Sequence, residues 1–373
     1  MVFMKVLVFG PYDKNQNVNS SRLHALKKAG IEIEEFSSDF LKFNRADSKN
    51  YSAVQIAKSV VFFTVDSVRL FFRGLFAKGI DAIFVMHPGY FYVFSAKLLG
   101  IARKKKVFFF PLVSIHQTLI FQRKYFKKES IEAKIFSIAD KFSCNFSDII
   151  VLDTEHHAKY FSKTFGVSLK KFRHVFIGVD ECFTTQKKSR KNKDFEVLFY
   201  GSFIPGQALD KILEAAEILR EKKVKFTLVG NGPLFEYVKK LAQEKKLGNV
   251  VLYGWQPKEK IPSFISKADA GLGLLEDNEK TNLIIGNKVL EMISMKKPVI
   301  NFNCPGVREL LGNKKSALLI NSDPKSIADA ILFLKNNPDA RAKIGENAYN
   351  AFRKNCSSDS IGKKLKSLIE EVL

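Results

Sequence analysis

The sequence predicts an α/β protein with two domains, each a parallel sheet covered by helices. The chain has 373 residues, too long for one ordinary hydrophobic core. Short apolar strands alternate with amphipathic helices along its length, as in doubly wound sheets. A charged, unpatterned stretch at 187–194 interrupts this alternation, so we expect a linker there. The expected parts are an N-terminal Rossmann-like domain (1–186), a C-terminal one (195–355) and a final helix (356–373) that returns to the first domain.

The chain opens with a β-α-β unit. Lys5 to Phe9 is a buried type of strand, 10–13 is a turn, 20–29 is a helix ended by Gly30, and 31–34 alternates as a second strand. This order is typical of a Rossmann-like domain. The turn lacks the G-x-G-x-x-G fingerprint, which counts against an NAD enzyme.

A long helical pattern at 51–79 is rich in phenylalanine, and Arg69, Arg73 and Lys78 flank its apolar positions. Two interpretations stay open. The helix is either a core helix between a sheet and solvent, or a helix that lies on a membrane surface.

The net charge of +23 is concentrated in the first half, which also holds most of the 35 phenylalanines. A basic and apolar half favours an anionic, lipid-like partner. We expect an anionic membrane surface or a lipid-linked acceptor there. The candidate contacts are Arg69, Arg73, Lys104, Lys105, Arg123, Lys124 and Lys127. No nucleic-acid motif accompanies the charge, so no nucleic-acid partner is expected.

Other features place the protein in the cytoplasm. The four cysteines are widely spaced and fit free thiols in a reducing compartment. No apolar run reaches the ~18 residues of a membrane span, and the N-terminus lacks a signal-peptide pattern. Together with the basic charge, this favours a cytoplasmic protein that lies peripherally on the inner face of the cell membrane.

Glycine loops follow the strands of the second half. They lie at 201–206 and 230–233, and each leads into a helix. Because glycine lets the backbone approach a phosphate closely, these loops are candidate binding sites. In the first half, His116 follows a strand and is a candidate base, with a structural role as the alternative.

The stretch 282–300 combines a turn, a short helix and a strand. Gly286 and Asn287 open the helix, whose free amides and positive dipole end suit a phosphate. Glu291, one turn further on, could accept hydrogen bonds from a ribose. The alternative is an ordinary turn followed by a solvated glutamate.

The order of several motifs resembles the group 1 glycosyltransferases of family GT4. The matching stretches are YGSFIPGQ at 200–207, LVGNGPL at 228–234, ADAGLG at 268–273, the stretch 282–300, and GVRELL at 306–311. The resemblance implies the GT-B fold, in which two Rossmann-like domains face each other across a cleft. It also implies a retaining enzyme with a nucleotide-sugar donor of UDP or GDP type and a saccharide or lipid-linked acceptor.

The resemblance assigns roles to individual residues. It places the donor mainly on the C-terminal domain, at Gly201, Ser202, Gly230, Gly232, Gly286, Asn287, Lys288 and Glu291, and it makes His116 a donor-contacting histidine. Glu291 matches the second glutamate of E-x7-E, but Leu283 stands at the first. Ser202 and Gln207 stand where relatives carry Arg and Lys, so the diphosphate would depend on backbone amides and Lys288. No D-x-D motif occurs, and no metal or other cofactor is expected. A scaffold that binds without transferring sugar is the alternative.

Overall fold

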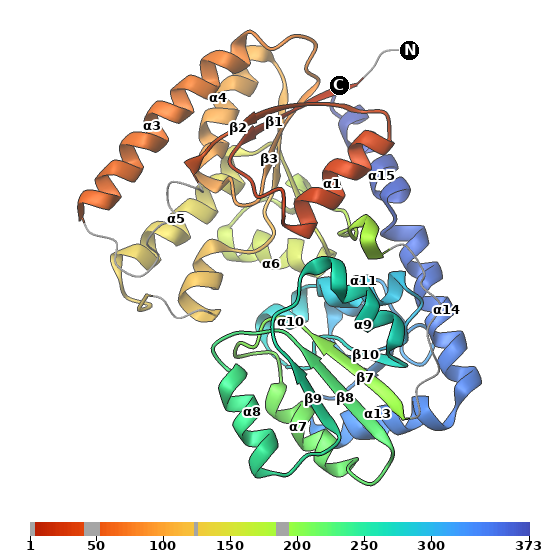
Figure 1. Cartoon of the computed structure of the whole chain (residues 1–373). Helices are drawn as coiled ribbons and strands as arrows, with labels where there is room; N and C mark the ends of the chain where they lie inside the picture. The colour runs from red at the N-terminus through yellow and green to blue at the C-terminus, as the bar shows by residue number, and fades with distance from the viewer. Residues whose placement is uncertain (1–3, 41–52, 123–125, 184–193) are drawn as a thin grey trace. The chain divides into compact units, whose positions relative to one another are not determined.

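The computed structural model describes residues 4–40, 53–122, 126–183 and 194–373. For residues 53–57 and 121–122 it describes the backbone only. Almost all of the expected linker, and Arg123 and Lys124, lie outside these residues. The chain divides into two compact units (Figure 1). Unit 1 comprises Met1–Phe176 with Ser358–Leu373, and unit 2 comprises Ile177–Ser357.

Unit 1 is built on a parallel sheet whose described strands follow the order β2-β1-β3-β4-β5-β6. The inner strands β1, β3, β4 and β5 are nearly continuous apolar runs because helices cover both faces of the sheet. Along β1, Val6 and Val8 face one core while Leu7 and Phe9 face the other. The strands are β1 (Lys5–Gly10), β2 (Glu32–Ser37), β3 (Ala82–Met86), β4 (Lys106–Phe110), β5 (Ile149–Leu152) and β6 (Phe172–His174).

Two layers of helices cover this sheet. Helices α1 (Asn17–Lys28) and α15 (Ser358–Glu370) pack on one face. The opposite face is covered by α3 (Ala53–Leu75), α4 (Val93–Arg103), α5 (Ile131–Phe146) and α6 (Glu155–Phe165). Short helical turns lie at η1 (Tyr90–Tyr92), η2 (Gln117–Gln122) and η3 (Leu169–Lys171).

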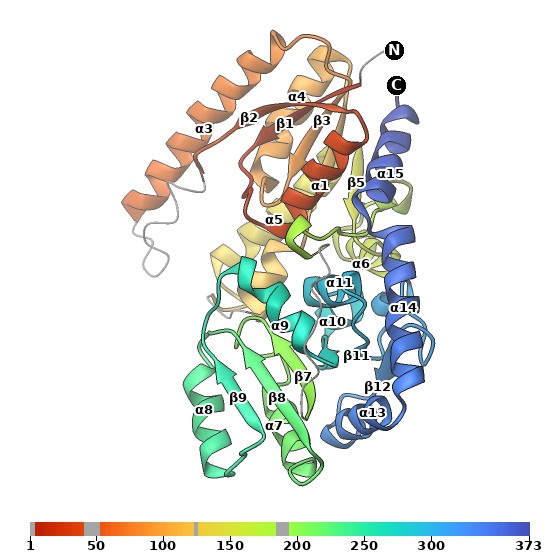
Figure 2. The same ribbon diagram turned by 45° about the vertical axis from the view of Figure 1, so that its right-hand side comes forward.

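The last helix of the chain packs against the first. α15 lies beside α1 in both views (Figure 2). Gly362 allows this close approach, because a Cβ there would lie 2.4 Å from the carbonyl oxygen of Ala25. An ion pair of 3.1 Å between Lys28 Nζ and Asp359 Oδ2 lies at the edge of the contact. The C-terminal segment is thus part of unit 1.

Unit 2 repeats the architecture with described strands in the order β12-β11-β10-β7-β8-β9. The order reverses between β7 and β10, and ligands of such sheets bind at the carboxyl ends beside this switch point. The strands are β7 (Phe195–Tyr200), β8 (Val224–Val229), β9 (Val250–Tyr253), β10 (Ala270–Leu272), β11 (Val299–Phe302) and β12 (Leu318–Ile320). The helices are α7 (Leu209–Ile218), α8 (Phe235–Glu244), α9 (Ile261–Lys267), α10 (Glu279–Leu283), α11 (Asn287–Ser294), α12 (Pro305–Arg308), α13 (Pro324–Asn336) and α14 (Pro338–Asn355), with turns η4 (Glu181–Phe183) and η5 (Lys258–Lys260).

Within the described ranges, no helix has both the length and the apolar character needed to cross a bilayer. Within the Phe-rich pattern at 51–79, the described residues Ala53–Leu75 form α3. Its inner face is buried, with Leu70 fully covered, as the core interpretation expects. Its outer face is also apolar.

Candidate functional site

Two glycine loops at the carboxyl ends of β7 and β8 interlock. Gly201, Gly230 and Gly232 have φ values of +143°, +145° and +155°, which side chains rarely tolerate. A Cβ on Gly230 would lie 1.9 Å from the carbonyl oxygen of Gly201. The backbone amide of Phe203 also donates to the carbonyl of Asn231 at 2.9 Å. The two loops therefore form one backbone surface beside the switch point of the sheet.

We expect Gly230→Ala to destabilise unit 2 by about 2–4 kcal/mol, because the new methyl group clashes with backbone and cannot move aside. Thermal and urea unfolding of the full chain would measure the change. Gly248→Ala is the matched control, since a Cβ there meets no atom within 4 Å. Equal stability of the two variants would contradict the interlocked arrangement.

A lysine ammonium lies against the first glycine loop. Lys288 Nζ is 3.3 Å from the position that a Cβ on Gly201 would take. It donates to Gln207 Oε1 at 2.7 Å and lies 4.0 Å from the centre of the Phe199 ring. Burial lowers the Lys288 pKa to about 7, and the nearby Glu291 opposes this shift. Ser202 is exposed on the same loop.

The first two turns of α11 place Lys288 and Glu291 on the sheet side of the helix. Gly286 precedes the helix without a side-chain cap, and Asn287 is exposed at its first position. Glu291 is only 8% exposed, which rules out the alternative of a solvated glutamate. The Tyr200 hydroxyl donates to Glu291 Oε2 at 2.6 Å. Burial raises the pKa of Glu291 above its ordinary value.

A further ion pair borders Glu291, and the sequence motifs did not indicate it. Lys258 Nζ lies 2.6 Å from Asp180 Oδ2. Both groups act on the Glu291 pKa, Lys258 lowering it and Asp180 raising it. Asp180 belongs to unit 2 although it precedes the charged stretch at 187–194. A polar site thus gathers two lysines, two carboxylates and the Tyr200 hydroxyl within this unit.

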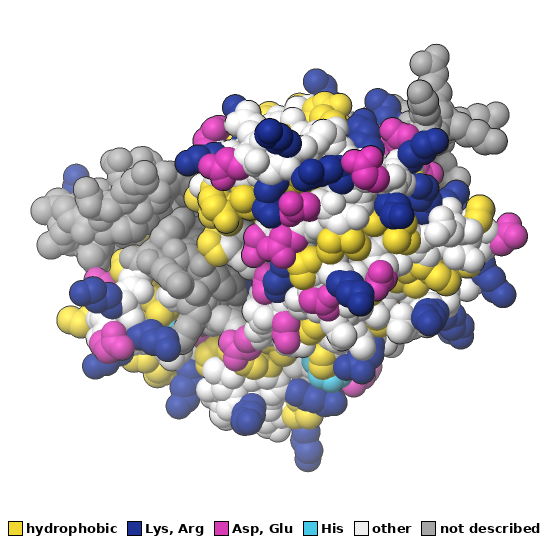
Figure 3. Space-filling model, turned by 90° about the horizontal axis from the view of Figure 1, so that it is seen from below, with side chains coloured by type: hydrophobic (Ala, Val, Ile, Leu, Met, Phe, Trp, Pro, Cys, Tyr) yellow, Lys and Arg dark blue, Asp and Glu magenta, His cyan; other side chains and the backbone are white. Residues whose placement is uncertain are grey.

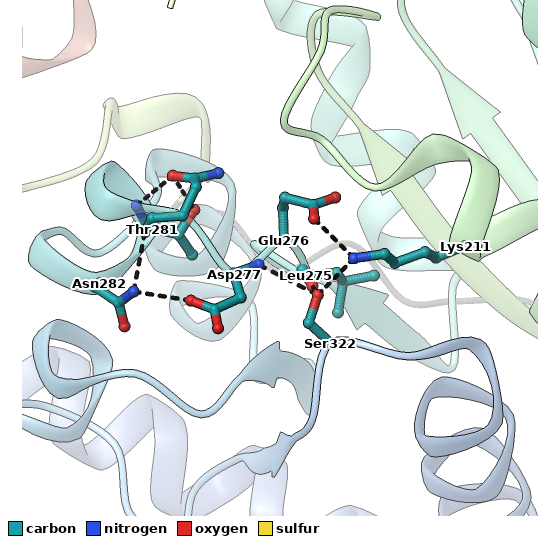
Figure 4. Close-up of polar contacts among 8 residues, drawn as sticks. Lys211, Leu275, Glu276, Asp277, Thr281, Asn282 and Ser322 are labelled. Carbon is teal, nitrogen blue, oxygen red and sulfur yellow. Dashed lines mark hydrogen bonds and ion pairs between the residues drawn. The ribbon is translucent and has the colours of Figure 1, made fainter. Parts of the chain in front are cut away.

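The loop between β10 and α11 is held by a polar network (Figure 4). Lys211 Nζ donates to Glu276 Oε1 at 2.7 Å and to Ser322 Oγ at 2.8 Å. Ser322 Oγ in turn donates to the carbonyl of Leu275 at 2.7 Å. This network fixes the loop that leads to α10 and α11.

The same loop approaches the first glycine loop and carries Leu283. A Cβ on Gly206 would lie 3.5 Å from Asn278 Nδ2. Leu283 ends α10, and its carbonyl lies 2.7 Å from where a Cβ on Gly306 would be. The backbone that surrounds the missing first glutamate is therefore held against α12.

In unit 1, a buried aspartate holds the loop that carries His116. Asp140 is fully buried on α5 and accepts from the backbone amides of Ile115 and His116 at 3.1 and 3.0 Å. The Ser114 hydroxyl donates to it at 2.6 Å. Burial raises the Asp140 pKa to about 6, and partial burial lowers the pKa of His116. Nothing in the sequence pattern singled out Asp140, which lies 24 residues from His116 along the chain.

The basic candidates of unit 1 lie on or beside the helices of one face. Arg69 pairs with Asp66 at 2.6 Å, and the Arg73 guanidinium lies 4.3 Å from the centre of the Phe36 ring. Lys105 lies 3.7 Å from Asp81. Lys104 ends α4, and Lys127 is exposed before α5. Figure 3 shows a different face, the lower end of Figure 1 where α7, α8 and α13 are drawn, and there Lys and Arg side chains are interspersed with Asp and Glu.

No group of three or more His, Cys, Asp or Glu side chains is arranged to hold a metal ion in the part of the chain that the structure describes. All four cysteines lie in the described residues as thiols outside any disulfide, and three of them (Cys144, Cys304 and Cys356) are buried.

Residues 182–351, which include the glycine loops, Lys288 and Glu291, match the sequence model of the family Glycosyl transferases group 1. Residues 182–351 therefore resemble a group 1 glycosyltransferase domain. An uncharacterized glycosyltransferase of Methanocaldococcus jannaschii is 25% identical over 158 residues, 42% of this chain and 43% of that protein. The alpha-D-kanosaminyltransferase of Streptomyces kanamyceticus is 26% identical over 180 residues, 47% of this chain and 45% of that protein. The chain thus aligns with less than half the length of these curated relatives.

Solved structures extend the likeness to both units. Anabaena HepE, crystallised in complex with UDP, has a TM-score of 0.70 and 13% identity over 99% of this chain and 100% of that one. At this identity the likeness concerns the fold. The predicted GT-B fold, with two Rossmann-like domains, is confirmed.

Proposed function

We propose that this protein moves a sugar from a nucleoside-diphosphate sugar of UDP or GDP type to a hydroxyl group of a saccharide or lipid-linked acceptor. One observation carries the proposal. A buried carboxylate, Glu291, and a cation, Lys288, lie within the first two turns of α11, whose N-terminus adjoins two interlocked glycine loops. The carboxylate suits the hydroxyls of a ribose, and the cation suits a diphosphate. The glycine loops let the backbone lie close to the phosphates.

We assign the donor contacts to unit 2. Glu291 would accept from the ribose hydroxyls, since a carboxylate with its second oxygen held by Tyr200 is oriented before the ligand arrives. Gly201, Gly230 and Gly232 would let the backbone approach the diphosphate, and Ser202, Gly286 and Asn287 would border it. Lys288 would donate to a phosphate oxygen in place of its present bond to Gln207.

The proposed chemistry needs stabilisation of negative charge on the departing nucleoside diphosphate. Lys288 and the amides of the first turn of α11 are preorganised donors for that charge, so we propose metal-independent transfer. We further propose retention of anomeric configuration, as the family resemblance implies. His116, with its pKa lowered and its loop fixed by Asp140, is the proposed catalytic residue, with the donor-sugar contact that the family resemblance implies.

We also propose that the enzyme works on the inner face of the cell membrane as a peripheral protein. The net charge of +23 supports attraction to anionic lipids, at about 1 kcal/mol for each basic residue near the surface. Arg69, Arg73, Lys104, Lys105 and Lys127 supply such charges within unit 1.

A thermal-shift panel with UDP, GDP, ADP and CDP tests the donor site. A nucleotide at ~100 times its dissociation constant adds about 2.7 kcal/mol of stability, so we expect one of them to raise the melting temperature by several degrees. The base of that nucleotide names the donor class, and transfer assays with its sugars follow. No shift with any nucleotide would contradict the proposal and favour a scaffold whose donor site was lost with Leu283, Ser202 and Gln207.

A further inference from the structure

Three neighbouring helices of unit 1 carry apolar stripes on their solvent side. The exposed stripe members are Val61, Val65, Val68 and Phe72 on α3, Phe94, Leu98 and Ile101 on α4, and Ile131, Ile135, Ile138 and Phe142 on α5. The least exposed is Leu98 at 44%, and the most exposed is Ile131 at 74%. We call this set the outer apolar face.

The spacing shows that each stripe is a continuous helix face. Members follow one another at intervals of four, three and four residues on α3 and on α5, and of four and three on α4, which is one side of a 3.6-residue helix. Each stripe lies opposite the stripe that contacts the sheet, represented by Leu70 on α3 and Leu99 on α4. These helices are therefore apolar on two opposite sides.

The three stripes lie on neighbouring helices that cover the same face of the sheet. α4 packs against both α3 and α5 on the same face of the sheet, so their outer sides point the same way (Figure 1). The ring of Phe94 on α4 lies 5.2 Å from that of Phe146 on α5, which stacks on Phe142 at 5.7 Å. Single exposed apolar side chains are ordinary, but a contiguous apolar surface of this extent marks an interaction site.

We propose that the outer apolar face docks unit 1 onto the surface of an anionic lipid bilayer. The charges around this face favour an anionic bilayer over a second copy of the chain. Exposed basic side chains on these helices or just beyond their ends include Lys58, Arg69, Arg73, Lys104, Lys127, Lys128, Lys134 and Lys141. Within the described residues of α3, α4, α5 and the stretch 127–130, Glu129 and Glu132 are the only exposed acids. A second copy would bring the same positive charge against this rim, whereas anionic headgroups complement it.

The inference rests on the proposed transfer to a membrane-bound acceptor and names the surface that reaches it. The stripes lie parallel to the membrane in this arrangement, with valine, isoleucine and phenylalanine in the acyl boundary and the lysines at headgroup level. Charge alone would give binding that salt abolishes, whereas inserted side chains leave a salt-resistant part.

The test is co-sedimentation of the full chain with vesicles of phosphatidylcholine, with and without phosphatidylglycerol. We expect wild type to bind the anionic vesicles. The variant Val65→Ser, Phe72→Ser, Ile138→Ser, Phe142→Ser should bind them more weakly by about tenfold or more, because each large side chain loses its apolar contact. The control, Ile218→Ser with Tyr237→Ser, removes two comparably exposed side chains (52% and 55%) from unit 2 and should bind as wild type does.

Three outcomes would overturn the inference. They are absence of wild-type binding to anionic vesicles, equal binding by wild type and the stripe variant, and a wild-type dimer that the stripe substitutions split without any vesicle binding. The nucleotide thermal shift, measured on the same variants, keeps the two proposals apart. If the stripe variant keeps its nucleotide shift but loses vesicle binding, the docking face is supported. If wild type binds vesicles but shows no nucleotide shift, the docking face still stands and the proposed donor site fails.

Discussion

Glu291→Gln is expected to lower the catalytic efficiency of sugar transfer by about 100-fold while the protein remains folded. The amide keeps the shape of the side chain and can still accept from the Tyr200 hydroxyl, which now donates to Glu291 Oε2 at 2.6 Å. It removes the negative charge that would accept from two ribose hydroxyls. The loss of a charged acceptor in a buried site is worth about 1.5–3 kcal/mol for each hydrogen bond.

Steady-state transfer rates and nucleotide affinity by calorimetry would measure this change. Glu346→Gln is the matched control, because Glu346 lies on α14, is half exposed and pairs with Lys296 at 2.9 Å. Wild-type activity of Glu291→Gln with the donor identified by the thermal-shift panel would contradict the ribose role. A melting curve would reveal an unfolded variant. In that case Tyr200→Phe tests the same carboxylate, because it removes the hydroxyl that donates to Glu291.

Much of the fold could be predicted because it is encoded locally. Apolar runs such as Val107 to Phe110 have nowhere to be buried on both sides except the centre of a parallel sheet. Glycines followed by helix starts indicated which strand ends carry loops suited to phosphate. The restart of the strand-helix alternation at Phe195 indicated a second sheet.

The site was less predictable because its decisive contacts are distant in sequence. Spacing alone left Glu291 either solvated or functional, and only the packing of α11 against β7 buries it beside Tyr200. The pair of Asp180 and Lys258 joins positions 78 residues apart, and neither belongs to a motif. Asp140 likewise acts on His116 through the fold, not through spacing.

The outer apolar face shows a further limit of pattern analysis. A periodic apolar stripe predicts a helix with one buried side. A helix such as α3 with two opposite stripes reads from its sequence as generally hydrophobic, and periodicity cannot tell which side contacts the sheet. Only the three-dimensional structure separates Leu70, which is fully buried, from Phe72, which is 55% exposed.

Lys288 should make nucleotide binding depend on pH near neutrality. Its pKa of about 7 in the free protein lies far below the usual 10.5 because the ammonium is buried. Between these two values the unfolded chain binds more protons at this group than the folded chain does. This lysine therefore lets the folded state gain stability as pH rises from about 7 to about 10.5, and it costs stability below that window.

A bound diphosphate would reverse this preference. Its negative charge favours the ammonium form and raises the Lys288 pKa, so binding above pH 7 takes up a proton. We expect the affinity for the nucleoside diphosphate to fall by about tenfold between pH 7 and about pH 8.5. The phosphate's own titration, with a pKa near 6, lies below this range and does not mimic the effect.

Calorimetry in two buffers of different ionisation enthalpy would measure both the affinity and the proton uptake. Lys288→Met should bind more weakly at pH 7 and lose the proton uptake, whereas Lys296→Met, at an exposed lysine paired with Glu346, should behave as wild type. A wild-type affinity that does not change with pH would mean that this ammonium does not contact the ligand. If the affinity depends on pH in wild type but not in Lys288→Met, the diphosphate binds at the junction of α11 and the first glycine loop. There Lys288 now donates to Gln207.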